Sequence, residues 1–96
     1  MGIIKRVDEN QAELVGLLRR LGASVLVLSS VGKGCPDILI GLKGNNYLLE
    51  IKSNMKSKLT EHEQKFFDTW NGQVAIVRSD TDVIDFLNNV TRGTFA

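Results

Sequence analysis

The sequence has 96 residues, which is the length of one domain, because most domains hold roughly 100–150 residues. Charged residues make up 24% and hydrophobic residues 43% of it, a composition typical of globular proteins that excludes a disordered chain. The formal net charge of +1 argues against a simple basic nucleic-acid binder, in which the domain pI usually exceeds about 9. The single cysteine excludes an internal disulfide.

The net charge conceals an asymmetry along the chain. Residues 1–60 contain nine Lys or Arg and five Asp or Glu, a net charge of +4, whereas residues 61–96 have a net charge of −3. The N-terminal part is therefore basic although the whole chain is almost neutral. No run of about 20 apolar residues predicts a transmembrane helix.

The first half of the chain predicts one helix followed by strands. The helix is expected over residues 9–21, with Asp8 as its N-cap and Gly22 ending it. The short apolar run 23–28 predicts a buried strand, and a loop follows it. The apolar side chains of the helix recur at helical spacing, at Leu14, Leu17, Leu18 and Leu21.

A hairpin is predicted next, formed by strands over residues 36–42 and 46–52. The only proline, Pro36, opens the first of these strands, where proline is tolerated. The dipeptide Gly44-Asn45 is a two-residue turn signal. Counting outward from this turn pairs Lys43 with Asn46. The predicted register then places Asp37 opposite Lys52 and Leu39 opposite Glu50.

The second half of the chain predicts a helix, a strand and a helix after a lysine-rich loop over residues 53–58. Thr60 and Glu63 form a capping box, residues 73–78 are a strand, and Ser79 or Asp80 caps the last helix. The order α-β-β-β-α-β-α predicts a single α/β domain whose mixed sheet is flanked by helices, with loose ends over 1–7 and 92–96. The side chains expected to point inward are Phe66, Phe67 and Trp70 in one helix and Val83, Ile84, Leu87 and Val90 in the other.

Three charged side chains share one face of the predicted hairpin. Because side chains alternate along a strand, Asp37, Glu50 and Lys52 project from the same side of the sheet. Two carboxylates on a buried strand pair are costly unless a cation compensates them, and Mg²⁺ prefers such oxygen ligands. A lysine beside the ion could stabilise negative charge developing on phosphorus. This combination predicts a phosphodiester hydrolase.

The same residues carry a resemblance to a known family. Pro36-Asp37, followed after twelve residues by Glu50-Ile51-Lys52, is similar to the PD-(D/E)XK nuclease signature. The strings over 34–38, 59–64 and 74–79 resemble the narrower virus-type replication-repair nuclease (VRR-NUC) domain. The resemblance extends from Glu13 to about Leu87, and it implies a restriction-endonuclease-like core.

The resemblance also implies roles for individual residues. Asp37, Glu50 and the backbone carbonyl of Ile51 would bind Mg²⁺ or Mn²⁺, and Lys52 would be the catalytic lysine. Glu13 matches a first-helix glutamate that often joins the metal site in these nucleases. Gln64 matches a glutamine near the metal or the phosphate. The chain departs from the family pattern at Cys35, where an aliphatic residue is more usual.

Each assignment has a purely structural alternative. Asp37 after a proline could simply form a turn, and Glu50 with Lys52 could be an exposed cross-strand pair. Glu13 could be an ordinary surface residue, and Gln64 an ordinary helix former. Cys35 has no partner residue for nucleophilic chemistry, so we expect it to be inert. Loop lysines that could contact DNA phosphates, or could simply be solvated, are Lys33, Lys56 and Lys58.

We therefore expect a metal-dependent DNA endonuclease that leaves a 5′-phosphate, as the resemblance implies. A small core offers little surface for gripping DNA, which predicts a symmetric homodimer. Two paired sites suit a four-way junction, so the expected activity resembles that of a Holliday-junction resolvase in DNA repair. The expected location is the cytoplasm of a bacterial or phage-infected cell. The alternatives are an exonuclease, a restriction-like nuclease and a non-catalytic DNA-binding module.

Overall fold

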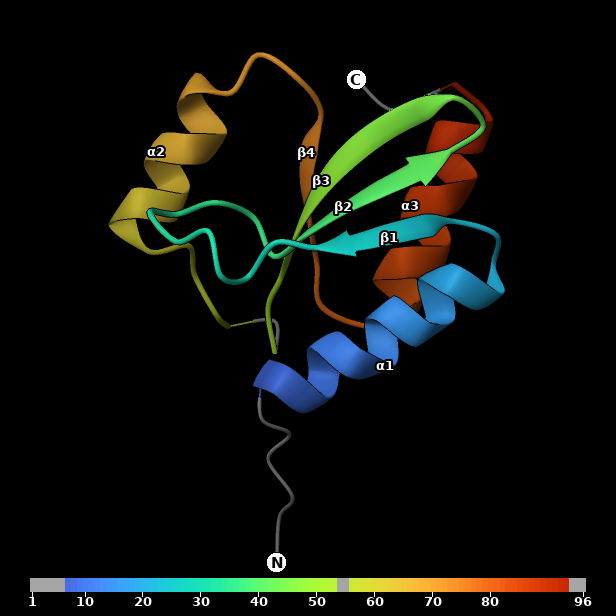
Figure 1. Ribbon diagram of the computed structural model, residues 1–96, viewed down its shortest axis with the longest axis horizontal. Helices are drawn as coiled ribbons and strands as arrows, with labels where there is room; N and C mark the ends of the chain where they lie inside the picture. The colour runs from blue at the N-terminus through green and yellow to red at the C-terminus, as the bar shows by residue number, and fades with distance from the viewer. Residues whose placement is uncertain (1–6, 54–55, 94–96) are drawn as a thin grey trace, which may run out of the picture.

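The computed structural model describes residues 7–53 and 56–93. The outer parts of both predicted loose ends, 1–6 and 94–96, lie outside the described residues, as do residues 54–55 of the lysine-rich loop. The elements follow the predicted order (Figure 1). They are α1 (Val7–Arg20), β1 (Ser24–Val27), β2 (Ile38–Leu42), β3 (Asn45–Ile51), α2 (Glu61–Thr69), β4 (Val74–Val77) and α3 (Asp80–Thr91).

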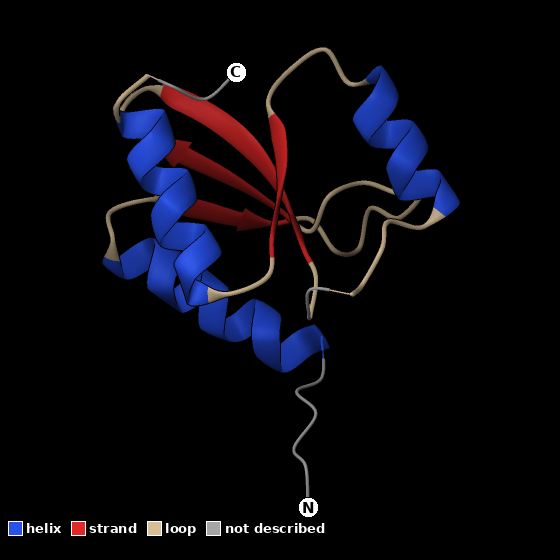
Figure 2. Cartoon of the chain, turned by 180° about the vertical axis from the view of Figure 1, so that it is seen from behind, coloured by secondary structure: helices blue, strands red, loops and turns tan. Residues whose placement is uncertain are grey.

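The four strands form one mixed sheet in the order β1-β2-β3-β4. The pairs β1–β2 and β2–β3 are antiparallel, whereas β3 and β4 are parallel and joined through α2, as predicted. Helices α1 and α3 lie together on one side, and α2 stands apart from them on the other side of the sheet (Figure 1; Figure 2). The structure therefore confirms an α/β domain. None of the described helices has the length and apolar character needed to cross a membrane.

The hydrophobic core lies between the sheet and helices α1 and α3. Alternating residues of the central strands, among them Ile38, Ile40 and Leu49, are fully buried on this face. The predicted inward stripes are correct for Leu14, Leu18, Val83 and Leu87, which are buried, and wrong for one residue in each stripe. The predicted core residues Leu21 and Ile84 are 47% and 46% exposed, and Phe86 is buried in the core although it was not predicted there.

The hairpin turn differs from the prediction by one position. Lys43 and Gly44 are the central residues, with φ angles of 51° and 85°. Positive φ at both positions is typical of a type I′ turn, whose twist matches that of the flanking strands. Leu42 therefore pairs with Asn45, and Ile38 with Leu49. The register is shifted by two residues from the prediction, so every side chain keeps its predicted face but has a different partner.

Helix α2 begins as predicted but packs differently. The capping box is present, because Thr60 Oγ1 accepts a hydrogen bond from the Glu63 backbone and Glu63 Oε1 accepts one from the Thr60 backbone. Ser79 is the N-cap of α3, as predicted. Asp8 is not an N-cap but lies inside α1, which starts at Val7, two residues before the predicted start of the helix. The predicted burial of Phe66, Phe67 and Trp70 is wrong. No side chain of α2 is buried, and Trp70, just after the helix, is 47% exposed and stacks on Phe66. Helical spacing predicts that these aromatic residues share one face of the helix. It does not predict whether another element packs against that face.

The backbone of a loop lies close against the start of α2. Gly34, in the loop between β1 and β2, lies against the first turn of the helix with a φ of 79°. A Cβ at this position would lie 2.4 Å from the carbonyl oxygen of His62 and 2.9 Å from the backbone nitrogen of Glu63. Only glycine fits here without displacing the helix.

We predict that Gly34→Ala destabilises the protein more than Gly32→Ala does. Both positions have a similar positive φ, but a Cβ at Gly32 meets no atom within 4 Å. Gly32→Ala should therefore lose only about 1–2 kcal/mol of unfolding free energy through backbone strain. Gly34→Ala should lose roughly 1–3 kcal/mol more through overpacking. Urea unfolding measures both losses, and equal losses would contradict the close approach.

Candidate active site

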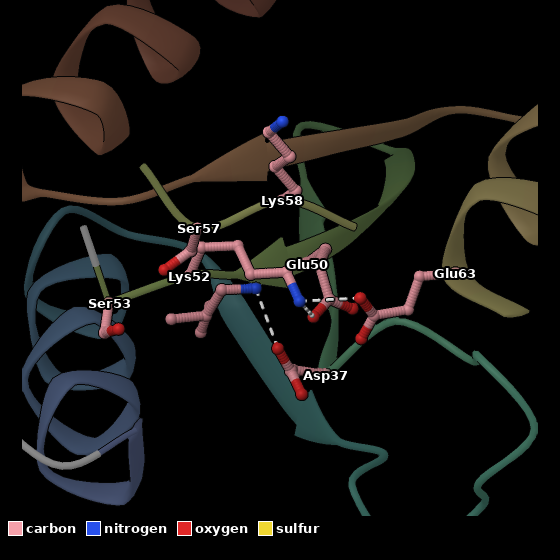
Figure 3. A pocket seen from close by; sticks show the side chains of 8 residues that line it. Asp37, Glu50, Lys52, Ser53, Ser57, Lys58 and Glu63 are labelled. Atoms are coloured by element: carbon pink, nitrogen blue, oxygen red, sulfur yellow. Dashed lines mark hydrogen bonds and ion pairs between the residues drawn. The ribbon is translucent and has the colours of Figure 1, made fainter. Parts of the chain in front are cut away.

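The predicted carboxylates and lysine meet at a pocket of about 440 Å³ on the sheet face opposite α1 and α3. Asp37 precedes β2, Glu50 lies in β3, and Lys52 directly follows β3. Their side chains point toward one another, with Glu63 of α2 approaching from the opposite side (Figure 3). The pocket is lined by Asp37, Glu50, Ile51, Lys52, Ser53, Ser57, Lys58 and Glu63.

Asp37 is held from both neighbouring strands. Its backbone carbonyl accepts a hydrogen bond from the Leu28 backbone at 2.8 Å, which continues the β1–β2 pairing. Its carboxylate oxygen Oδ2 accepts a hydrogen bond from the backbone nitrogen of Ile51 at 2.7 Å. The preceding residue, Pro36, is fully buried. These contacts fix the carboxylate at the edge of the pocket.

Glu50 is the buried carboxylate of the site. The residue is 3% exposed, and its Oε1 atom is buried without a hydrogen-bond partner among the described residues. Burial, reinforced by the negative charges of Asp37 and Glu63, raises the pKa of Glu50 to about 8 against the opposing effect of Lys52. A carboxyl group in this environment retains its proton at neutral pH unless a cation balances its charge.

Lys52 stands between two carboxylates. Its ammonium nitrogen Nζ is 2.6 Å from Glu63 Oε1 and 3.5 Å from Glu50 Oε2. Burial alone would lower the pKa of Lys52, but the hydrogen bond to Glu63 and the nearby negative charges outweigh that effect and raise it. The side chain is therefore a cation at neutral pH. The backbone carbonyl of Lys52 accepts a hydrogen bond from the buried amide of Asn10 in α1.

Glu63 belongs to the site although the sequence interpretation assigned it only a capping role. Burial would raise its pKa, but hydrogen bonds from Lys52 and the Thr60 backbone, together with the charge of Lys52, lower it overall. Glu63 is therefore ionised at neutral pH. The capping box was the available signal, because it predicts that the side chain of Glu63 turns back toward the start of the helix.

The structure does not bring the two remaining predicted site residues to this pocket. Glu13 is exposed on α1 and lines a separate hollow with Arg20 and Asp80. Gln64 is exposed on α2 and donates a hydrogen bond to Asp68 at 2.9 Å. Each helix does contribute a neighbouring residue to the region, Asn10 from α1 and Glu63 from α2.

The other predicted residues lie at the rim or in the loops. Lys58 lines the pocket, and its ammonium group extends away from the carboxylates (Figure 3). Lys33 and Lys56 are exposed outside the pocket. Cys35 is half-buried, and burial and the charges of Asp37 and Glu50 raise the pKa of its thiol. A thiol with a raised pKa is a poor nucleophile, in keeping with its predicted inert role.

The donor set fits a hard divalent cation. No three His, Cys, Asp or Glu side chains within residues 7–53 and 56–93 already form a metal cage. However, Oε1 of Glu50 is buried without a hydrogen-bond partner among the described residues, and the Asp37 side chain lines the same pocket. Mg²⁺ needs only one or two protein carboxylates, because it retains several waters. A cation here would remove the cost of the buried, unpartnered oxygen.

We predict that the metal-free protein loses stability as the pH rises from about 5 to 8. In this range the unfolded chain releases the Glu50 proton, whereas the folded state retains it because its pKa is about 8. The folded state then binds more protons, so the unfolding free energy falls with pH. Glu50→Gln should flatten this dependence in urea unfolding with EDTA present. An equally steep fall in Glu50→Gln would contradict the assignment.

Comparison with known proteins adds no functional evidence, so the functional inference rests on the geometry of the site. The chain matches no protein-family model, no curated protein and no solved structure.

Proposed function

We propose that this protein is a metal-dependent DNA endonuclease that hydrolyses phosphodiester bonds. One observation carries the proposal. Asp37 and Glu50, from adjacent strands, converge with Lys52 on one pocket, and a buried oxygen of Glu50 has no partner among the described residues. A mere exposed cross-strand pair would not leave Glu50 at 3% exposure. The burial favours a site built to receive a cation.

The side chains divide the proposed chemistry between them. Asp37 and Glu50 would hold Mg²⁺ or Mn²⁺, with the Ile51 backbone carbonyl as the proposed third protein ligand. When bound, the cation supplies Lewis-acid polarisation of a phosphodiester oxygen. The hydrogen bond from Ile51 N to Asp37 Oδ2 holds one carboxylate in place before any ion arrives. The protein thereby keeps the cation ligands preorganised.

Lys52 serves this chemistry as a cation and hydrogen-bond donor. Its pKa is raised by its carboxylate neighbours, so it does not act as a general base near neutral pH. Its ammonium group can donate a hydrogen bond to a phosphate oxygen or orient the attacking water. A preorganised donor aimed at developing negative charge typically contributes about 10²–10³ in rate.

The resemblance to VRR-NUC nucleases supports DNA as the substrate and a four-way junction as its preferred form. The motif residues Asp37, Glu50 and Lys52 are the ones that meet in the pocket. Glu13 and Gln64, which the resemblance also assigns to the site, do not line this pocket. A restriction-like nuclease, an exonuclease or a non-catalytic DNA-binding module each gives a different result in the assay below.

We further propose a homodimer, supported by apolar side chains that stand exposed on the site's side of the sheet. Leu26 of β1 is 58% exposed and pairs in register with Leu39. Alternation along β2 places Leu39 on the same face as Asp37. Trp70, which follows α2, is also exposed. A second copy packed against these side chains, beside the pocket and not over it, would bring two sites near one DNA molecule.

In an assay of labelled four-way junction, flap, nicked and linear duplex DNA, the junction should be cut fastest in the presence of Mn²⁺, and no substrate should be cut in EDTA. Asp37→Asn and Lys52→Met should each lower the rate at least about 100-fold. Lys65→Ala, which removes an exposed lysine of α2 outside the pocket, is the matched control and should retain activity.

Each alternative function predicts a different result in this cleavage assay. Absence of metal-dependent cutting of every substrate, with binding retained, would indicate a DNA-binding module. Stepwise shortening from an end would indicate an exonuclease. Cutting of linear duplex at one internal sequence would indicate a restriction-like nuclease. Equal cutting of junction and linear duplex without such a sequence would leave the nuclease but remove the preference for junctions.

Light scattering should give the mass of a dimer for the wild type. Leu26→Glu should shift the protein to a monomer, because a charge would be desolvated at the interface. Ile84→Glu places the same charge at a similarly exposed apolar residue on α3, and it should leave the dimer intact. A monomeric wild type would remove the homodimer proposal.

A further inference from the structure

One carboxylate oxygen joins the start of α2 to the lysine of the candidate site. Glu63 Oε1 accepts a hydrogen bond from the Thr60 backbone at 2.8 Å and another from Lys52 Nζ at 2.6 Å. The Glu63 backbone nitrogen in turn donates to Thr60 Oγ1 at 3.2 Å. The same atom therefore completes the helix cap and receives the ammonium group.

The contact between Lys52 and Glu63 is buried enough to hold the two side chains in one arrangement. The Lys52 and Glu63 side chains are 14% and 17% exposed, so water screens them less than it screens an ordinary surface pair. The backbone of α2 is itself fixed by the close approach of Gly34 to His62 and Glu63. Glu63 thus projects from a defined position of the chain.

Glu63 also determines which carboxylate Lys52 favours. Its oxygen is 2.6 Å from Lys52 Nζ, whereas the nearer oxygen of Glu50 is 3.5 Å away. Of these two carboxyl groups, only Glu50 would be left near the ammonium group without Glu63, and Glu50 is the one that the proposed function assigns to the cation. With Glu63 present, the ammonium group is held nearer to Glu63 than to Glu50.

We propose that Glu63 is a positioning residue that fixes the Lys52 ammonium group for phosphodiester hydrolysis. This inference rests on the proposed nuclease function and adds a residue that the sequence signature does not include. Glu63 acts through Lys52 and needs no contact with DNA or metal. Its removal should therefore lower kcat while leaving KM for DNA nearly unchanged.

Three variants separate positioning from helix capping. Glu63→Ala removes both hydrogen bonds and should lower kcat roughly 10- to 100-fold, as expected for a misplaced catalytic group. Glu63→Gln keeps an acceptor oxygen and a residue suited to the capping box, so it should recover most of that loss. Thr60→Ala weakens the cap without touching Lys52, so it should lower the melting temperature while kcat stays within about twofold of wild type.

A second measurement does not depend on activity. The Lys52 side-chain ammonium signal in ¹H–¹⁵N NMR should show slowed proton exchange in the metal-free wild type and in Thr60→Ala. That protection should be lost in Glu63→Ala. An unchanged Lys52 signal in Glu63→Ala would overturn the positioning contact itself.

The kinetic outcomes distinguish this inference from the proposed function. Equal kcat values for Glu63→Ala and Thr60→Ala, in a protein that cuts DNA, would overturn the role of Glu63 and leave the nuclease intact. A wild type that cuts no DNA while the Lys52 signal behaves as expected would overturn the nuclease function and the catalytic role of Glu63 together. The Glu63–Lys52 contact alone would then remain.

Discussion

The burial of one carboxylate in the middle of the sheet is the constraint on which the rest of the site depends. Glu50 lies in β3, between β2 and β4, where few water molecules can solvate its charge. Every other group of the site compensates for this burial or adds to its cost. Lys52 supplies a positive charge two residues along the strand, whereas Asp37 brings a second negative charge from the adjacent strand. The arrangement is unfavourable for stability alone, and it is this cost that the proposed cation would offset.

The faces of the strands could be predicted from the sequence, but the hairpin turn could not. Asp37, Glu50 and Lys52 share a face by alternation, and a shift of two residues leaves every side chain on its own side. The two-residue shift in register therefore changes the cross-strand partners but leaves the three side chains of the site on one face. The turn was misplaced because Lys43 adopts a positive φ of 51°. That conformation is uncommon for lysine, and residue preferences alone favoured Gly44-Asn45.

The helical contributions to the site were harder to predict, because successive helix residues point about 100° apart. One step along α2 separates Glu63, which faces Lys52, from Gln64, which bonds to Asp68 instead. A motif matched one residue away selects the wrong side of the helix. Glu13 illustrates the same difficulty on α1, where the buried Asn10 reaches the end of β3. The periodicity of α2 correctly predicts an amphipathic helix, but it does not predict where that helix lies relative to the sheet.

Helix α2 is attached differently from α1 and α3, so its local stability differs from that of the core. The core beneath α1 and α3 is held by buried apolar side chains, whereas α2 buries none and is secured by polar and backbone contacts at its first turn. Elements with few buried contacts open locally at a smaller free energy than the global one. Mild denaturant or heat would therefore release α2, and Glu63 with it, while the sheet stays folded. The arrangement of the candidate site is in this sense less stable than the fold that carries it.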